Sequence, residues 1–376
     1  MRYAVSILIT CVLALLTLGM VLLCSAPAGF VHNNFEKHLA FCVLGVLACV
    51  LAARWDYGNL KKVSWLLYVL TLFALAGVLV FGVTRGGARR WFNFGFMLFQ
   101  PSELAKLALI VALAHYVDWN QRQMDQFLKG LLYPLLLSGL LMGLVLVEPD
   151  FGTTILLGTI AALLLLLGGI PLKRLAATAL VGLAIISVFI YYDPIRLERV
   201  KGYVNRQGQA VADLRDVNYH SEQSEIAIGS GGLTGLGLGQ GIMKMGSVPE
   251  NITDFIFSIV GEELGLAATI PVVLAYLAFC FCGFFISWRA RDAFGLYLGL
   301  GITCLIGLQA FINIGVVTGV LPNKGLPLPF VSYGGSSLVM MLTCVGLLLN
   351  VARHATEAEP AFAEPLTFDD LPATSI

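Results

Sequence analysis

Long apolar segments, separated by short polar ones, make up most of the sequence. A helix that crosses a bilayer needs about 20 mostly apolar residues, and ten segments meet this requirement. They cover roughly residues 4–24, 36–53, 63–83, 103–118, 131–147, 152–169, 172–192, 255–287, 293–315 and 332–351. The eighth is longer than one span needs, so we expect its first turns to lie in the membrane interface. The pattern predicts an all-α, polytopic integral membrane protein with about ten transmembrane helices.

Basic residues between the spans predict the orientation of the helices. Cytoplasmic segments carry an excess of Lys and Arg, and an N-terminus inside the cell assigns eleven to inner segments and five to short outer loops. The inner residues are Arg2, Arg54, Lys61, Lys62, Arg122, Lys129, Lys173, Arg174, Arg289, Arg291 and Arg353. The outer residues are Lys37, Arg85, Arg89, Arg90 and Lys324. We therefore expect both termini in the cytoplasm.

This orientation leaves one long extracytoplasmic loop, residues 193–252, between the seventh and eighth helices. Loops of this length in a compact protein are usually functional or disordered. Apolar and glycine-rich stretches follow its charged half, so we expect short helices that lie on the membrane. Residues 1–354 form one transmembrane domain, and the acidic segment 355–376 is expected to be a disordered cytoplasmic tail.

Composition excludes several other classes of protein. The chain is 58% hydrophobic and 12% charged, with a mean hydropathy of +0.85, which is not a soluble globular composition. Its net charge is zero and no basic run indicates a nucleic-acid partner. All eight cysteines lie inside or at the ends of apolar segments without a Cys-x-x-Cys pair, which indicates small core residues instead of metal ligands or disulfides.

The start of the fourth span carries two opposite charges, in the segment FQPSELAK. Glu103 and Lys106 are spaced i,i+3 and share a face of the predicted helix. Ionisable residues inside a span are costly and by default functional, although an ion pair that only neutralises itself is the structural alternative. Both interpretations remain open from the residues alone.

Two arginines and a tryptophan precede this span, in the segment GARRWFNFG. Arg89 and Arg90, beside Trp91, are suited either to lipid headgroups in general or to a pyrophosphate in particular. The residues alone do not separate these two roles.

The segment EPDFGTT, residues 148–154, breaks the helical pattern between two spans. Its Pro149 and Gly152 leave Glu148 and Asp150 at a turn. Asp150 is either an N-cap in a tight helical hairpin or part of a polar site.

The long loop contains seven glycines between Gly229 and Gly241, which allow close backbone approach to a ligand or to other helices. The run matches no nucleotide-binding motif. Asp254 follows it, where the loop meets the eighth span. A carboxylate at this boundary is well placed as a general base, whereas its structural alternative is a first-turn residue of a helix capped by Asn251. The residues do not show which of Glu262 and Glu263, two turns on, matters.

A last polar cluster runs from Asn313 to Val339 and holds three prolines and the turn Ser-Tyr-Gly-Gly-Ser. Irregular backbone at membrane depth is tolerated where it is buried in protein or lines a cavity. Lys324 is its one cation and can meet an anionic lipid headgroup. Lys324 and Ser336 are therefore further candidate substrate-binding residues.

These clusters, in this order, resemble the SEDS family (shape, elongation, division and sporulation), typified by RodA and FtsW. The matching segments are GARRWFNFG, FQPSELAK, EPDFGTT, IAIGSGGLTGLGLG, TDFIFSIVGEELG and LPNKGLPLPFVSYGGSS. They extend from the third helix to the tenth, in the order and ten-helix topology of the family. Details such as EPDFGTT and NKG favour the FtsW side, while PLPF is more typical of RodA. ENITDF stands where the family commonly has a histidine before the TD pair.

The resemblance implies a peptidoglycan glycosyltransferase of the cytoplasmic membrane that polymerises lipid II at the outer face, leaning toward septal wall synthesis in cell division. It also implies that Asp254 is the catalytic loop aspartate and that Glu103 and Lys106 line the substrate cavity. A class B penicillin-binding transpeptidase, with other divisome or elongasome membrane proteins, is the implied partner.

A transferase at the outer face has neither ATP nor nucleotide sugars, so its donor must be lipid-linked. We expect Asp254 to deprotonate the acceptor hydroxyl, with inversion at MurNAc C1 and release of undecaprenyl pyrophosphate to nearby cations. A divalent cation, Mg²⁺ or Mn²⁺, can assist this reaction as a cofactor, and the residues do not identify its protein ligands. The rival functions are a lipid II flippase or transporter, a scaffold, and a RodA-type enzyme of elongation.

Overall fold

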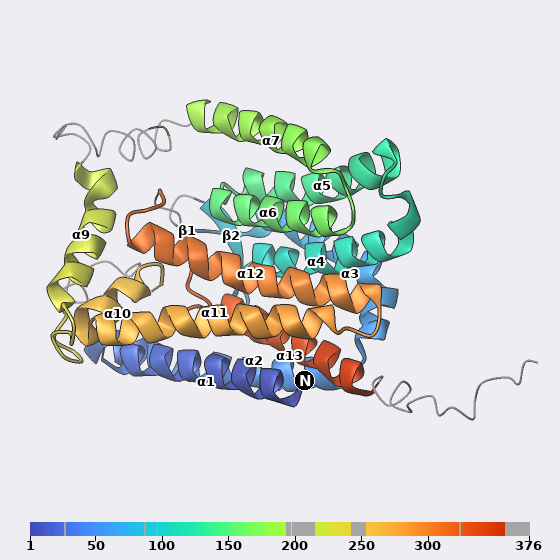
Figure 1. Ribbon diagram of the computed structural model, residues 1–376. Coiled ribbons are helices and arrows are strands. Elements are labelled where there is room, and N and C mark those ends of the chain that lie inside the picture. The colour runs from blue at the N-terminus through green and yellow to red at the C-terminus, as the bar shows by residue number, and fades with distance from the viewer. Residues whose placement is uncertain are drawn as a thin grey trace, which may run out of the picture.

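The computed structural model describes residues 1–25, 28–85, 88–95, 97–192, 197, 215–241, 253–322 and 325–357. Within them, most of the chain is α-helical, and the long helices lie alongside one another in a single bundle (Figure 1). The helices are α1 (Arg2–Cys24), α2 (Ala28–Arg54), α3 (Tyr57–Phe81), α4 (Pro101–Asn120), α5 (Tyr133–Val147), α6 (Phe151–Leu167), α7 (Leu172–Tyr192), α9 (Arg215–Gly231), α10 (Ile256–Leu264), α11 (Leu266–Trp288), α12 (Ala293–Val317) and α13 (Gly335–Glu357). A 3-10 turn (Gln121–Gln123) and a π-helical turn (Phe127–Leu132) connect α4 to α5.

The described helices confirm the prediction of a polytopic membrane protein. Seven have the length and apolar composition needed to cross a membrane: Arg2–Cys24, Phe35–Arg54, Tyr57–Phe81, Phe127–Val147, Leu266–Trp288, Ala293–Val317 and Gly335–Ala355. Helix α6 is apolar but shorter. Helices α4 and α7 occupy the fourth and seventh predicted spans, and α7 lies at the edge of the bundle beside α6 (Figure 1).

The helices differ in how far they are enclosed by protein. In their most apolar windows, α12 is 67% buried and α13 61%, whereas α2 is only 11% buried. Helix α4 is also interior, because nearly every side chain from Pro101 to Val117 is buried. Helix α11 exposes a stripe with the spacing of one helical face, as expected of a surface in contact with lipid: Leu266, Ile270, Leu274, Leu277, Phe281, Phe284 and Trp288.

A three-stranded antiparallel sheet between α3 and α4 was not anticipated from the sequence. Its strands are β1 (Val83–Arg85), β2 (Ala88–Asn93) and β3 (Leu98–Phe99), with β2 in the middle. We call the end of the bundle that carries this sheet, α9 and the connection between α12 and α13 the sheet end. Helix α1 begins at the opposite end (Figure 1). With the N-terminus inside the cell, the sheet end faces outward, and this orientation stays a prediction.

The predicted eighth span is two helices, α10 and α11, with a break at Gly265. Gly265 has φ +69°, a conformation that glycine adopts without steric cost. The glycine-rich turn after α9 hydrogen-bonds to this break: the Leu236 amide donates to the Glu262 carbonyl at 2.9 Å, and the Leu266 amide donates to the Gly232 carbonyl at 3.0 Å. These hydrogen bonds hold the chain at the break between α10 and α11.

Three of the described glycines of the loop, Gly231, Gly235 and Gly241, pack closely against α10. A Cβ atom at Gly231 would lie 1.9 Å from the Gly261 carbonyl oxygen, and one at Gly235 would lie 2.1 Å from that of Glu263. These glycines therefore bring the loop backbone against a helix, the second of the two roles considered. Apart from α9 and this turn, most of the predicted loop 193–252 lies outside the described residues, as does most of the tail 355–376.

Candidate active site

An ion pair is buried at the start of α4. Lys106 Nζ donates to Glu103 Oε1 at 2.8 Å, and the two side chains are 1% and 4% exposed. The i,i+3 spacing predicted from the sequence brings them together on the inward face of the helix. Glu103 Oε2 is buried and has no hydrogen-bond partner among the described residues. The pair therefore keeps an open acceptor inside the bundle, at the sheet end.

Two buried amide side chains on α12 extend the hydrogen-bond network of this ion pair. Gln309 Oε1 accepts a hydrogen bond from Lys106 Nζ at 3.0 Å, and Gln309 Nε2 donates to the Pro327 carbonyl at 2.8 Å. One turn further along the same face, Asn313 Nδ2 donates to the Leu326 and Asp254 carbonyls, both at 2.7 Å. The two amides thus join α4, α12, the α12–α13 connection and the segment before α10.

The α12–α13 connection has buried apolar side chains and is fixed through its carbonyl groups. Besides the contacts of Gln309 and Asn313, the Tyr276 hydroxyl on α11 donates to the Pro329 carbonyl. The Leu328 amide donates to Ser332 Oγ at 2.8 Å. This segment contains irregular backbone in the protein interior, and buried side chains supply the hydrogen bonds that water would otherwise provide.

Asp254 lies beside this connection. It is half-buried and precedes Phe255, the N-cap residue of α10, so it does not lie in the first turn of the helix as its structural alternative requires. A Cβ atom built on Gly325 would lie 2.5 Å from Asp254 Oδ2. The carboxylate therefore rests against the backbone of the connection, and its own main-chain carbonyl is held by Asn313. The proposed cap Asn251 lies outside the described residues.

The turn between α5 and α6 reaches the same connection through Gly152. A Cβ atom at Gly152 would lie 3.1 Å from Leu326 Cγ. Asp150 is the N-cap of α6, since Thr153 donates to its carboxylate from the backbone amide at 3.0 Å and from the hydroxyl at 2.8 Å. The structural role of Asp150 is thereby established, and a contact with substrate stays a prediction.

Glu148, in the same turn, is completely buried, and neither carboxyl oxygen has a hydrogen-bond partner among the described residues. Burial, together with the charge of Asp150, raises the pKa of the Glu148 carboxyl to about 8, although Arg90 opposes the shift. Arg90 Nε donates to the Glu148 carbonyl at 2.8 Å and Nη2 to the Pro149 carbonyl at 2.7 Å. Arg90 therefore clamps the backbone of the turn, which joins the small sheet to the start of α6.

The other predicted site residues are placed less centrally. Arg89 is exposed on β2, and Trp91 is half-buried on the same strand. Ser336 is half-buried in the first turn of α13. Their roles toward a substrate stay predictions, as does that of Lys324, which lies outside the described residues.

Glu262 and Glu263 are both buried in α10. Ser25 Oγ, at the end of α1, donates to Glu263 Oε2 at 3.0 Å. A Cβ atom on Gly241 would lie 2.8 Å from Glu262 Oε2. Glu263 therefore ties α10 to α1, while Glu262 packs against the end of the glycine-rich turn.

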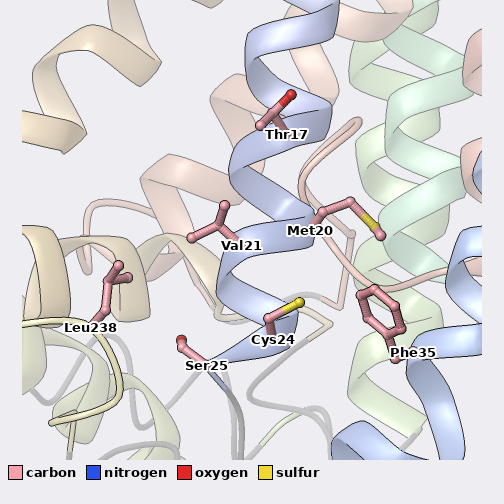
Figure 2. Close-up of a pocket in the computed structure, with 7 residues that line it drawn as sticks. All are labelled: Thr17, Met20, Val21, Cys24, Ser25, Phe35 and Leu238. Atoms are coloured by element: carbon pink, nitrogen blue, oxygen red, sulfur yellow. The ribbon is translucent and has the colours of Figure 1, made fainter.

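A groove of about 400 Å³ lies near this contact and has an almost entirely apolar lining. Met20 and Cys24 extend from α1 toward Phe35 of α2, and Leu238 of the glycine-rich turn lies beyond Val21 (Figure 2). The residues that line it include no carboxylate and no basic side chain, so the groove does not supply the acid–base chemistry sought here.

The described residues contain no group of three or more His, Cys, Asp or Glu side chains that could hold a metal ion. We therefore derive no catalytic step through a metal, and the expected divalent cation stays a prediction.

Three residues of this site were not singled out from the sequence. Gln309 and Tyr276 are isolated polar residues among mostly apolar neighbours, and Gly325 is one of many glycines. The only available signal was the polar spacing of Gln309 and Asn313 at i,i+4, which can equally well indicate a hydrogen bond between helices.

A bundle of membrane-crossing helices with buried charges, amides and a boundary carboxylate at one end defines a polytopic membrane protein with an internal polar site. Residues 5–357 match the family of FtsW, RodA and SpoVE, described as cell cycle proteins. The chain therefore belongs to this family, also called SEDS, which confirms the resemblance inferred from its motifs.

Curated relatives cover almost the whole chain. A probable peptidoglycan glycosyltransferase FtsW from Geobacter metallireducens is 37% identical over 94% of this chain and 95% of its own length. The stage V sporulation protein E of Bacillus subtilis is 35% identical over 93% of this chain and 97% of its own length.

Solved structures share the fold. One from a study of a peptidoglycan synthase complex that coordinates polymerization and crosslinking has a TM-score of 0.78 and 29% identity, covering 93% of this chain and 97% of the other. The rod shape determining protein RodA of Thermus thermophilus has a TM-score of 0.70 and 28% identity, covering 92% of this chain and 95% of the other.

Proposed function

We propose that the protein is a peptidoglycan glycosyltransferase that polymerises lipid II at the outer face of the cytoplasmic membrane, with Asp254 as the general base. The family and the relatives named FtsW support the activity and favour cell division over elongation. The observation that carries the site is the position of the Asp254 carboxylate. It rests against Gly325, on a connection hydrogen-bonded through Gln309 to the buried Glu103–Lys106 pair.

In this mechanism Asp254 removes the proton from the 4-hydroxyl of the acceptor GlcNAc. The oxygen attacks C1 of the MurNAc at the lipid-linked end of the growing glycan as the bond to undecaprenyl pyrophosphate breaks. The donor is an α-linked pyrophosphate and the product a β-1,4 glycan, so one displacement with inversion suffices. One base is enough for this chemistry. The leaving pyrophosphate carries the negative charge away and needs nearby cations.

The three described cations, Arg89, Lys106 and Arg90, differ in how they can serve that role. Arg89 is exposed at the sheet end, and its guanidinium can contact a pyrophosphate bidentately. Lys106 is buried and already donates to two acceptors, so it contributes positive charge to the interior. Two nitrogens of Arg90 are engaged by main-chain carbonyls, so Arg90 acts first on the geometry of the turn. Lys324 completes the proposed cation set.

The buried oxygens that lack partners fit a substrate rich in hydroxyl and amide groups. Glu103 Oε2 and Asn313 Oδ1 are acceptors without a partner among the described residues. An unmade hydrogen bond on a buried group costs about 1–3 kcal/mol, so such atoms mark places where a donor is expected. Sugar hydroxyls and N-acetyl groups are donors of that kind.

We also propose that a transpeptidase of the class B penicillin-binding type is the partner that crosslinks the strands. The solved relative from a peptidoglycan synthase complex that couples polymerization to crosslinking supports this assignment.

The test is polymerisation of purified lipid II by the purified protein, alone and with its transpeptidase partner. Glycan strands that lengthen with time, with release of undecaprenyl pyrophosphate, are expected from the wild type but not from Asp254→Asn. Lipid II that crosses vesicles without being polymerised would instead establish a flippase. Polymerisation only by the partner would establish a scaffold.

A further inference from the structure

The two amides on α12 are both buried and both bridge separate elements of the site. Gln309 is completely buried and Asn313 is 1% exposed. They follow one another on the same face of the helix, and between them they contact Lys106, two consecutive carbonyls of the α12–α13 connection and the carbonyl of Asp254.

The side-chain chemistry at these positions matches the partners closely. Lys106 can only donate and the Pro327 carbonyl can only accept, so the side chain between them must carry one acceptor and one donor. Gln309 has both, and turning its amide over would place donor against donor and acceptor against acceptor. Asn313 directs its amide nitrogen at two carbonyls, which a carboxylate of the same shape would repel.

We propose that Gln309 and Asn313 are positioning residues for glycan polymerisation, which set the place of Asp254 relative to the Glu103–Lys106 pair. This inference rests on the proposed role of Asp254. Asn313 fixes the main chain of Asp254 to the connection, and Gln309 fixes the same connection to Lys106. Because the two contacted carbonyls belong to neighbouring residues, Leu326 and Pro327, a shift at one amide is passed to the other.

The chain offers a matched control at the opposite end of the bundle. Asn350 on α13 is also completely buried, and its amide nitrogen donates to the carbonyls of Ala52, Ala53 and Trp55 at 3.1, 2.9 and 2.6 Å. Its contacts are at least as numerous as those of Asn313, but no predicted site residue is among them. A purely structural asparagine at position 313 should behave like this one.

The experiment compares Asn313→Leu with Asn350→Leu, since leucine has nearly the same shape without the amide. Both purified variants are assayed for lipid II polymerisation, with rates normalised to the folded fraction. Asn313→Leu should lower kcat about 10²-fold with little change in KM, the size of effect that a misplacement of about 1 Å can produce. Asn350→Leu should lose thermal stability while its kcat stays within about twofold of wild type. Equal kcat values for the two variants would overturn the proposal.

Gln309 provides a second test, and its two single variants do not depend on the folding of Asn313→Leu. Gln309→Glu keeps an acceptor for Lys106 but turns a carboxylate oxygen toward the Pro327 carbonyl, whereas Gln309→Leu loses both hydrogen bonds. Both should lower kcat. The effects of Gln309→Glu and Asn313→Leu should not add in the double variant, because both act through one segment. Wild-type kcat in either Gln309 variant would also overturn the proposal.

The proposed function and the positioning role can fail separately. If the wild type makes no glycan with or without its partner, the proposed function fails. If the wild type polymerises lipid II and Asp254→Asn does not, yet the amide variants retain normal kcat, only the positioning role fails.

Discussion

Two buried asparagines at opposite ends of the bundle show how its polar groups differ. At the opposite end, Asn350 uses both parts of its amide: Oδ1 accepts from the Tyr57 amide at 3.2 Å, and Nδ2 donates to the carbonyls that end α2. At the sheet end, Asn313 uses only its nitrogen, and Oδ1 has no partner among the described residues. The first satisfies a helix end, and the second leaves an acceptor available.

The same difference extends to the neighbouring groups. At the opposite end, Asp292 caps α12 through the Gly295 amide at 2.7 Å and also accepts from the Tyr57 hydroxyl at 3.2 Å. At the sheet end, Glu103 Oε2 and both oxygens of Glu148 are buried without a partner in the described part of the chain. Buried polar atoms are normally paired, so incomplete pairing at one end indicates where a ligand acts.

The largest effect is expected at Asp254. Asp254→Asn should reduce the polymerisation rate by about 10²–10⁴-fold, which is the contribution expected of a general base. Thermal stability should stay nearly unchanged. The reason is that asparagine has nearly the same shape as aspartate and that Asp254 precedes Phe255, the N-cap residue of α10.

Asp292→Ala is the matched change at the opposite end. Loss of its cap should cost about 1 kcal/mol of stability and leave the rate per folded molecule unchanged. Normal polymerisation by Asp254→Asn would contradict a catalytic role for the sheet end of the bundle.

The buried ion pair should show the next largest effect. Lys106→Met leaves the Glu103 carboxylate uncompensated, which costs about 3–5 kcal/mol for a buried pair, so expression should fall sharply. The neutral double variant Glu103→Gln with Lys106→Met should recover expression but not polymerisation, because the charges proposed to line the substrate cavity are gone. Membrane yield and lipid II turnover are measured on the same preparations.

The comparison pair is Lys61–Asp118 at the opposite end, where the lysine side chain is 38% exposed. Lys61→Met should cost at most about 1 kcal/mol and leave turnover intact. Full activity in the neutral double variant would make the Glu103–Lys106 pair structural only.

A smaller effect is expected at Gly325. Gly325→Ala would place a methyl group 2.5 Å from Asp254 Oδ2, so the carboxylate must shift. We expect kcat to fall about tenfold with stability nearly unchanged, since a small displacement of a catalytic group is costly. Gly139→Ala on α5, where a Cβ atom would meet nothing within 4 Å, is the control and should have no effect on kcat.

The smallest effect concerns Glu148 and pH. Its folded-state pKa, about 8, lies above the ordinary value of 4.5, so the folded protein holds a proton that the unfolded chain releases. The resulting stabilisation is complete below the unfolded-state pKa and is lost as pH rises through about 8. Melting temperatures measured from pH 6 to 9 should therefore fall more in wild type than in Glu148→Gln. Parallel curves would show that Glu148 does not titrate in this range.

Much of the fold could be predicted because a span is a local pattern. About 20 apolar residues identify a helix without knowledge of its neighbours, and the pair Glu103 and Lys106 follows from helical spacing. The break at Gly265 could not be predicted, because the sequence does not distinguish a glycine with positive φ from the other glycines. The strand Ala88–Asn93 could not be predicted either, because it lies in a short polar segment between two spans.

The candidate site was only partly accessible from sequence for the same reason. Asp254 stood out as an acid at a membrane boundary. Its neighbour Gly325 and the amide that holds its carbonyl, Asn313, are distant in the chain, and no local pattern relates them. Gln309 was missed because a neutral amide in an apolar helix has no single interpretation, even with a second amide at i,i+4.

The break at Gly265 also has a consequence for protein engineering. Asp254 lies just before α10 and is held through its carbonyl by Asn313, and α10 is held by the glycine-rich turn and by Ser25, whereas α11 has an exposed apolar stripe. The exposed stripe of α11 can therefore be exchanged between family members, provided that Tyr276, which holds the Pro329 carbonyl, and the other buried residues of the helix are kept. Such chimeras should keep the catalytic geometry of this protein while acquiring the membrane-facing surface of the other family member.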